Sequence, residues 1–255
     1  MQANTLYLDT TIQVSKLFAP HTIRSQILQR IDQNHCVVSR YVRMEYMRWL
    51  EPCIHLQTLL QEEIANNPLT AISEVQARVL LIYGRKQKKM HSILMWLSRY
   101  QNSQDAHGIL SNLNSLIKDK FRTLFDKDVT ELPDSIGCPL MDLRAIPHDT
   151  GYRLDPDIPY RKGEMPCHIV DFLQEHRKQL EALVPALGDG YPKLADACQR
   201  VLANPTDAQG NTCKTLADVI IALQTPADAI LWTTDASFDV ICPVLGIEHI
   251  REPLR

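Results

Sequence analysis

The sequence predicts an α/β fold with one parallel sheet flanked by helices and interrupted by a mainly α-helical insertion. Short apolar runs alternate with helical stretches at both ends of the chain, whereas the middle is helical without strands between. Alternation of this kind is typical of a parallel sheet with helices on its faces. We therefore expect a discontinuous domain of residues 1–54 and 190–255, with residues 55–189 inserted between its two parts.

The first elements follow the order strand, helix, strand, helix. The apolar run TLYLD predicts a strand that ends at Asp9, and the helical stretches TTIQVSKLF and HTIRSQILQRID follow it. HCVVS is a second β-branched run, and Ser39 is placed to cap the helix YVRMEYMRWL.

The middle of the chain predicts helices and then a loop. From about residue 55 to 128, apolar residues such as Val75, Val79 and Ile82 recur at helical spacing, which predicts two to four helices. Residues 129–170 carry six of the fifteen prolines. Because proline disfavours helices and central strands, this segment is expected to be a Pro-rich loop.

The last elements alternate again. Helices are expected at HIVDFLQEHRKQLEALVPAL, KLADACQRVLA and TLADVIIALQ, with a break at GDGYP. AILWTTD predicts a strand that runs into a turn at Asp235, followed by a short helix and a last strand near IEHI.

Composition places the chain in the ordinary globular class. It has 255 residues, of which 45% are hydrophobic and 22% charged. No stretch approaches the ~20 apolar residues of a membrane span, and the start lacks the pattern of a secretory signal. The seven cysteines include no CxxC, which indicates reduced thiols rather than a disulfide framework or a zinc ribbon. We expect a cytoplasmic protein without a membrane partner.

Four acids are expected at one edge of the predicted sheet. Asp9 directly follows the first strand, and Asp235 holds the matching position after AILWTT. Glu45 lies in the first turns of the helix after the second strand, and Asp218 lies near the start of the helix that precedes the strand AILWTTD. Strand ends and helix starts converge where parallel α/β sheets bind ligands, so these carboxylates are expected to face one cleft.

Such a cluster predicts a metal site. Carboxylates that meet repel one another unless cations compensate them. Hard oxygen ligands suit Mg²⁺ or Mn²⁺. These ions lower the pKa of a bound water and neutralise charge on a phosphoryl oxygen, which favours hydrolysis of a phosphodiester.

The motifs LYLDTT, SRYVRME, TLADVIIAL and TTDASF, followed by LGIEHI, together resemble the successive motifs of the PIN-domain family. They cover roughly the first 50 and the last 45 residues, and their order and spacing carry the resemblance. Asp218 and Asp235 are 17 residues apart, as a helix followed by a strand requires. The long separation between Glu45 and Asp218 departs from a compact member and implies an insertion between about 55 and 190.

Many PIN-domain proteins are metal-dependent ribonucleases, including toxins of toxin–antitoxin systems. The resemblance therefore implies a nuclease with Mg²⁺ or Mn²⁺, whose catalytic and metal-binding acids are Asp9, Glu45, Asp218 and Asp235. It assigns supporting roles to Thr10, beside the first acid, and to the hydroxyl of Thr233. RNA is the expected substrate, with DNA left open. The resemblance is compatible with an antitoxin, another protein or a second copy of the chain as a partner.

Two alternatives stay open at this point. Asp189 or Asp196 could be the third acid in place of Asp218. An Asp after a strand is also often a helix cap or turn former. A PIN-like module that binds nucleic acid or protein without catalysis is therefore the rival interpretation.

The positive charge is concentrated in the middle of the chain. Residues 78–127 contain ten Lys or Arg and three acids, a local charge of +7, whereas the rest of the chain carries −10. We expect this segment to contact the phosphate backbone of RNA through Arg85, Lys86, Lys88 and Lys89. A solvated helix face is the alternative. Trp96 and Tyr100 are candidates for base stacking, with core packing as the other role for Trp96.

Overall fold

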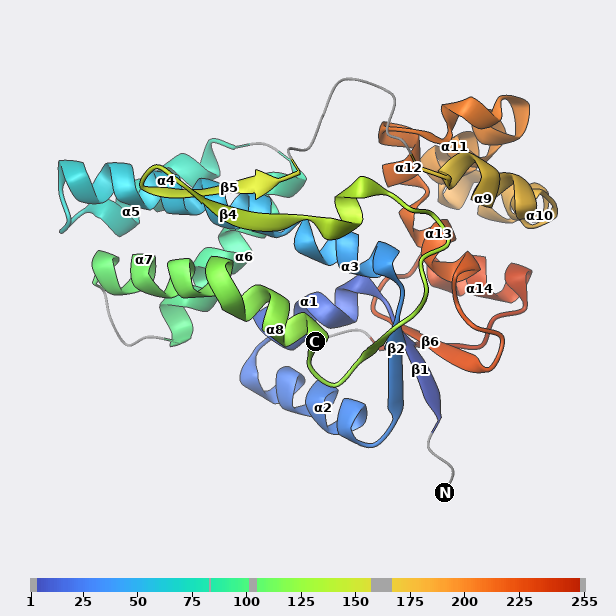
Figure 1. The fold of residues 1–255 in the computed structure, drawn as a ribbon, viewed down its shortest axis with the longest axis horizontal. Coiled ribbons are helices and arrows are strands. Elements are labelled where there is room, and N and C mark those ends of the chain that lie inside the picture. The colour runs from blue at the N-terminus through green and yellow to red at the C-terminus, as the bar shows by residue number, and fades with distance from the viewer. Residues whose placement is uncertain (1–3, 83, 101–104, 157–166, 253–255) are drawn as a thin grey trace.

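A parallel five-stranded sheet forms the centre of the computed structural model, which describes residues 4–82, 84–100, 105–156 and 167–252. The strand order is β3-β2-β1-β6-β7, and Figure 1 shows β1, β2 and β6 side by side. The strand bounds are β1 Thr5–Leu8, β2 His35–Val38, β3 Thr130–Glu131, β6 Ala229–Thr233 and β7 His249–Arg251. The α/β class with a parallel sheet flanked by helices is confirmed.

The order of the strands reverses at β1. From β1 the chain passes through α1 (Thr10–Phe18) and α2 (His21–Asp32) to β2 on one side, whereas β6 and β7 lie on the other side. The carboxyl ends of β1 and β6 therefore flank a topological switch point, which is where open α/β sheets form their ligand crevice. The chain leaves these two strand ends at Asp9 and Thr234.

Side chains cap the first two helices that follow strands. Asp9 accepts a hydrogen bond from the backbone N–H of Thr10, and Ser39 accepts one from the N–H of Val42 at the start of α3 (Arg40–Met47). The predicted cap at Ser39 is confirmed. A side-chain oxygen at this position satisfies an N–H group that has no partner within the helix.

The helical middle segment occupies one half of the molecule, on the left of Figure 1. Its elements are α4 Leu50–Asn66, α5 Ala71–Leu80, α6 Arg85–Tyr100, α7 Ala106–Ser115, the π-helical η1 Leu116–Lys120 and α8 Phe121–Asp126. Aromatic rings join it to the sheet domain. The Tyr46 and Phe121 ring centroids are 4.5 Å apart, and those of Phe18 and Phe121 are 6.2 Å apart.

The segment predicted to be a Pro-rich loop at 129–170 contains strands, so that prediction was wrong in part. β3 is the edge strand of the main sheet, and β4 (Arg144–His148) pairs antiparallel with β5 (Gly151–Asp155) after the short η2 helix Pro139–Asp142. Pro147 lies within β4, which is tolerated because a two-stranded ribbon consists of edge strands. Residues 157–166 of this segment lie outside the described residues.

β3 also bears on the predicted division of the chain. The strand lies within residues 55–189 and yet pairs with β2, Val37 opposite Thr130. The segment expected to be a helical insertion thus returns to the sheet and completes its edge. The sequence signal was weak because β3 has only two residues.

The C-terminal part forms the other half of the molecule, in orange and red in Figure 1. Its helices are α9 Ile169–Glu175, α10 Arg177–Leu187, η3 Gly188–Gly190, α11 Pro192–Ala203, η4 Pro205–Ala208, α12 Asn211–Thr215, α13 Ala217–Leu223 and α14 Phe238–Leu245. Helices lie in each stretch where the sequence predicts one, but the stretch expected as one helix over 168–187 is divided at His176 into α9 and α10, and α12 was not expected. The strand expected near IEHI is β7.

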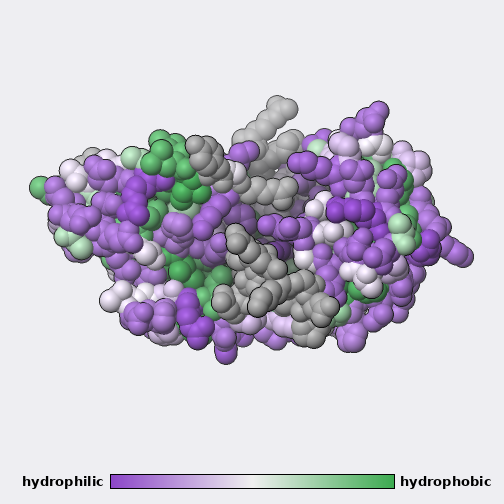
Figure 2. Space-filling view, turned by 90° about the horizontal axis from the view of Figure 1, so that it is seen from above, coloured by the Kyte–Doolittle hydropathy of each residue, from purple (hydrophilic) through white to green (hydrophobic). Residues whose placement is uncertain are grey.

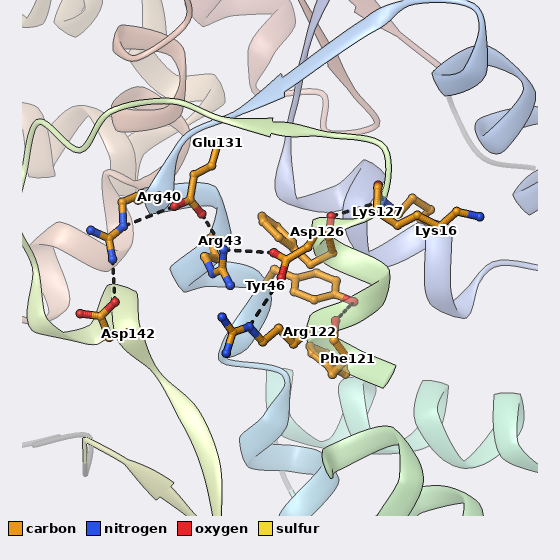
Figure 3. A network of polar contacts seen from close by, with 11 residues as sticks. Lys16, Arg40, Arg43, Tyr46, Phe121, Arg122, Asp126, Lys127, Glu131 and Asp142 are labelled. Atoms are coloured by element: carbon orange, nitrogen blue, oxygen red, sulfur yellow. Dashed lines mark hydrogen bonds and ion pairs between the residues drawn. The ribbon is translucent and has the colours of Figure 1, made fainter. Parts of the chain in front are cut away.

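An arginine–carboxylate network fastens α3 to β3 and α8 (Figure 3). The Arg43 guanidinium lies 2.8 Å from Glu131 and 3.1 Å from Asp126, and Arg40 lies 2.6 Å from Asp142. Tyr46 donates to the carbonyl of Phe121 at 3.1 Å. Each partly exposed ion pair is worth at most about 1 kcal/mol, but together these contacts hold α3 in place.

The face shown in Figure 2 is mostly hydrophilic, and the larger of its apolar areas lies on the helical half. The exposed large hydrophobic side chains of the described chain are Leu69, before α5, and Leu80 and Leu81, at its C-terminal end. No described helix has the length and apolarity needed to span a membrane.

Candidate active site

A cleft of about 1160 Å³ opens at the carboxyl ends of β1 and β6. This volume is slightly above the range of about 300–1,000 Å³ found for small-molecule pockets. Both halves of the molecule contribute to it. The cleft contains all four acids singled out in the sequence, namely Asp9, Glu45, Asp218 and Asp235.

Asp9 lies at the buried centre of the acids. One carboxylate oxygen accepts from the Thr10 N–H at 2.5 Å, and the other accepts from the hydroxyls of Thr11 at 2.6 Å and Thr233 at 2.7 Å. Burial raises the pKa of Asp9 above its usual range, and these hydrogen bonds act in the opposite direction. The carboxylate is therefore fixed in orientation by neutral donors.

Glu45 reaches the same place from the second turn of α3. The hydroxyl of Thr10 donates to its carboxylate at 3.3 Å, so Thr10 bonds Asp9 through its backbone and Glu45 through its side chain. Burial raises the pKa of Glu45, and the neighbouring charge of Asp9 raises it further. The two carboxylates thus destabilise each other's charge.

Asp218 and Asp235 are joined by Ser237. The Ser237 hydroxyl donates to Asp218 at 2.8 Å, and its backbone N–H donates to Asp235 at 2.9 Å. Burial, followed by the charges of Asp9 and Asp235, raises the pKa of Asp218 to about 7. The Asp235 carboxylate itself is exposed, at the rim of the cleft.

One continuous hydrogen-bond network therefore runs through the four acids. Thr233 donates to Asp9 and accepts from the Asp235 N–H at 3.0 Å, and Thr11 accepts from the Thr234 N–H at 3.1 Å. The supporting positions expected for Thr10 and Thr233 agree with this geometry. Thr11 and Ser237 were missed.

The signal for Ser237 was present in the sequence. An Asp two residues before a Ser commonly bonds the N–H of that Ser in an Asx turn, as Asp235 does here. That turn brings the Ser237 hydroxyl to Asp218. Thr11 directly follows Thr10, but nothing in its neighbours indicates which Asp9 oxygen it contacts.

The alternative third acids lie elsewhere. Asp189 is in the η3 turn and Asp196 lines a separate shallow groove along α11, and neither is among the residues that line the main cleft. Asp218 is the acid that shares the cleft with Asp9, Glu45 and Asp235.

The chemistry of the acids suits a hard cation, but the ligand set is not assembled. Within the described chain, no Lys, Arg or His forms an ion pair with any of the four, and Glu45, Asp218 and Asp235 each retain an oxygen without a hydrogen bond to a described residue. Carboxylate oxygens of this kind are Mg²⁺ and Mn²⁺ ligands. In the described residues, however, no three acids, histidines or cysteines are grouped closely enough to hold a metal ion.

Cations line the remaining wall of the cleft. Of the four basic residues expected to contact phosphates, Lys86 and Lys89 line the cleft, whereas Lys88 is exposed and is not part of it. The side chain of Arg85 lies outside the described residues. Lys86 is 3.5 Å from Glu51, a pair exposed enough to be worth little.

Lys89 is the most enclosed of these cations. Its ammonium lies 4.7 Å from the centre of the Trp49 ring. Burial lowers the pKa of Lys89 to about 8, and the charge of Glu45 opposes that shift. Trp96 packs edge-on against Phe18 with centroids 5.7 Å apart and is partly buried against the core. The side chain of Tyr100 lies outside the described residues.

Comparison with known proteins gives no relative: no protein-family model, curated protein or solved structure matches the chain. The site itself therefore carries the functional argument.

Proposed function

We propose that this protein is a divalent-metal-dependent nuclease with a PIN-like fold, which hydrolyses phosphodiester bonds of RNA. The observation that carries the proposal is the position of the acids. Asp9 and Asp235 follow the two strands that flank the switch point of a parallel sheet, and Glu45 and Asp218 meet them in one cleft. Like many PIN-domain proteins, it would act in the cytoplasm as a toxin or a defence effector.

The raised pKa values support a cation as the ligand of this cleft. Three carboxylates, those of Asp9, Glu45 and Asp218, have pKa values raised by burial, and for Glu45 and Asp218 the neighbouring acids add to the shift. A bound divalent ion would reverse that cost because it favours the ionised form of every carboxylate around it.

The roles of the chain's own groups follow from their contacts. Asp9 and Asp235 would be the principal ligands of the ion, while Glu45 and Asp218 would complete its shell or orient a water. Thr10, Thr11, Thr233 and Ser237 keep the carboxylates oriented through neutral hydrogen bonds. Mg²⁺ or Mn²⁺ supplies the charge that polarises a phosphoryl oxygen and acidifies water.

The test is cleavage of mixed single-stranded RNA and DNA by the purified protein with Mg²⁺ or Mn²⁺. Cleavage of RNA that disappears in Asp9→Asn and Asp218→Asn, but persists in Asp196→Asn, is expected. Asp196 is a matched control because it is also a helical Asp and lies outside the main cleft. No cleavage by the wild type, or equal cleavage by Asp9→Asn, would exclude the enzymatic proposal.

A non-catalytic PIN-like binding module is the second candidate, and one observation favours it. Asp9 already accepts three hydrogen bonds and caps α1, so its carboxylate has a structural role without any metal. For that candidate, Mn²⁺ would not bind the purified protein, whereas RNA or a protein partner would bind without being cleaved.

A further inference from the structure

Three cations in the cleft come from separate parts of the chain. Arg48 follows the last residue of α3, Lys89 lies on α6 and Lys214 lies on α12. They are more than 120 residues apart at the extremes and belong to both halves of the molecule. The fold therefore concentrates positive charge where the sequence does not.

These cations have no acidic partner. Arg48, Lys89 and Lys214 form no ion pair with any described residue, unlike Arg43 and Arg78, each of which pairs with two acids. Glu45 is nonetheless close enough that its charge opposes the lowering of the Lys89 pKa by burial. Within the described residues, no ion pair joins Arg48, Lys89 or Lys214 to Asp9, Glu45, Asp218 or Asp235, although all seven line one cleft.

The three cations also act on one another. All three line the same cleft, and the charges of Arg48 and Lys214 both act on Lys89. The Lys89 ammonium lies over the ring of Trp49, which is itself stacked on Phe18 with an interplanar angle of 26°. The Lys89 ammonium is therefore held near like charges rather than extended into water.

We propose that Arg48, Lys89 and Lys214 form a phosphate-binding subsite that holds the backbone of a single nucleic-acid strand next to the acids. The subsite rests on the proposed function for its neighbour, the cation held by the four carboxylates. Phosphate oxygens satisfy a guanidinium and two ammonium groups together, since Arg binds such oxygens in a bidentate manner and Lys as a point charge.

The volume of the cleft agrees with one strand rather than a duplex. A volume of about 1160 Å³ is close to that of pockets for drug-sized molecules, so it admits a few nucleotides of one strand. Tyr191, which precedes α11, also lines the cleft and offers an aromatic ring to a base, as is common in grooves for single strands.

The test measures binding without metal. Fluorescence anisotropy of a short labelled single-stranded RNA is titrated with the full chain in EDTA, at several salt concentrations. Lys89→Gln and Lys214→Gln are each expected to weaken binding about three- to tenfold and to lower the salt slope by about 0.7. Lys88→Gln is the matched control on the same helix, because Lys88 lies outside the cleft and should leave both quantities unchanged.

The outcomes separate this proposal from the nuclease proposal. Asp9→Asn, which should abolish cleavage, is expected to keep or strengthen RNA binding because it removes a negative charge. RNA binding that depends on Lys89 and Lys214 therefore supports the subsite even if no nuclease activity exists. Inorganic pyrophosphate is titrated in parallel as a competitor.

Three results would overturn the subsite. The first is that the wild type binds no RNA, and the second is that Lys88→Gln weakens binding as much as Lys89→Gln. The third is that the substitutions affect pyrophosphate but leave RNA unchanged, which would indicate a site for a small anion. Lys214 is exposed on a short helix, so Lys214→Gln remains informative if Lys89→Gln fails to fold.

Discussion

Two faces of α3 meet acids in opposite ways. On the side of β3 and α8, Asp126, Glu131 and Asp142 are each paired with Arg40 or Arg43 (Figure 3). In the cleft, Asp9 and Glu45 are held by threonine N–H and hydroxyl groups and by no described cation. We call these two regions the arginine network and the acid cluster.

Under the proposed function, this difference separates a structural role from a binding role. In the arginine network the negative charge is compensated within the protein, so no ligand is needed. In the acid cluster, neutral donors fix the carboxylates but leave much of their charge in place, and burial then raises the pKa values of Asp9, Glu45 and Asp218. The free-energy cost of ionising these buried carboxylates is expected to be offset when a cation binds.

The largest expected effect is on activity. Asp9→Asn should lower RNA cleavage by about 100-fold or more, because several kcal/mol of charge stabilisation are lost and each 1.4 kcal/mol is tenfold in rate. Asp126→Asn, in the arginine network, should leave the cleavage rate within about twofold. Initial rates with Mn²⁺ check both variants, and similar losses in the two would remove the distinction between the regions.

The next effect concerns the hydroxyls that orient the acids. Thr233→Val keeps the shape of a fully buried side chain and removes the hydroxyl that donates to Asp9. Metal affinity or activity should fall about 10- to 100-fold, as is usual when a group that orients a metal ligand is lost. Calorimetry with Mn²⁺ and initial rates measure it. A variant that binds and cleaves like the wild type would show that the network does not orient the site.

Stability should change in opposite directions in the two regions. Asp218→Asn removes a charge that burial and neighbouring acids disfavour, so the metal-free protein should become more stable at pH 7 by about 1–3 kcal/mol. Asp126→Asn breaks contacts with Arg43 and Arg122 and should cost up to about 1 kcal/mol. Urea unfolding in EDTA gives both values, and a destabilised Asp218→Asn would contradict the electrostatic account.

The smallest effect is a pH slope with a defined sign. The folded-state pKa of Asp218 is raised from 3.8 to about 7, so the folded protein binds its proton more tightly than the unfolded chain does. The contribution to stability is complete below about pH 4 and is lost as the pH rises to about 7. Urea unfolding in EDTA across this range should show a steeper decline for the wild type than for Asp218→Asn. Equal slopes would argue against the raised pKa.

The sequence predicted the ends of the strands and the acids that follow them. Short apolar runs followed by an acid or a capping Ser indicate where β1, β2 and β6 stop, and the rule for parallel sheets then brings Asp9 and Asp235 together. These are local signals combined with one topological rule, which explains why they were sufficient.

Other features depend on contacts that linear spacing does not encode. The choice of Asp218 over Asp189 or Asp196 follows from how the C-terminal helices pack, and β3 is too short to leave a periodic signal. Which lysines face the cleft is a question of helical phase. Lys86 continues the buried stripe of Met90, Ile93 and Leu97 and reaches the cleft, whereas Lys88 lies on the opposite face.

The central claim is that the acid cluster is a cation site, and a calorimetric titration with Mn²⁺ tests it most directly. The wild type is expected to bind Mn²⁺ and to gain about 2.7 kcal/mol of stability when the ion is present at 100 times its Kd. Asp9→Asn and Asp235→Asn should abolish this binding, while Asp126→Asn should retain it. Absence of Mn²⁺ binding in the wild type, or unchanged binding in Asp9→Asn, would contradict the claim.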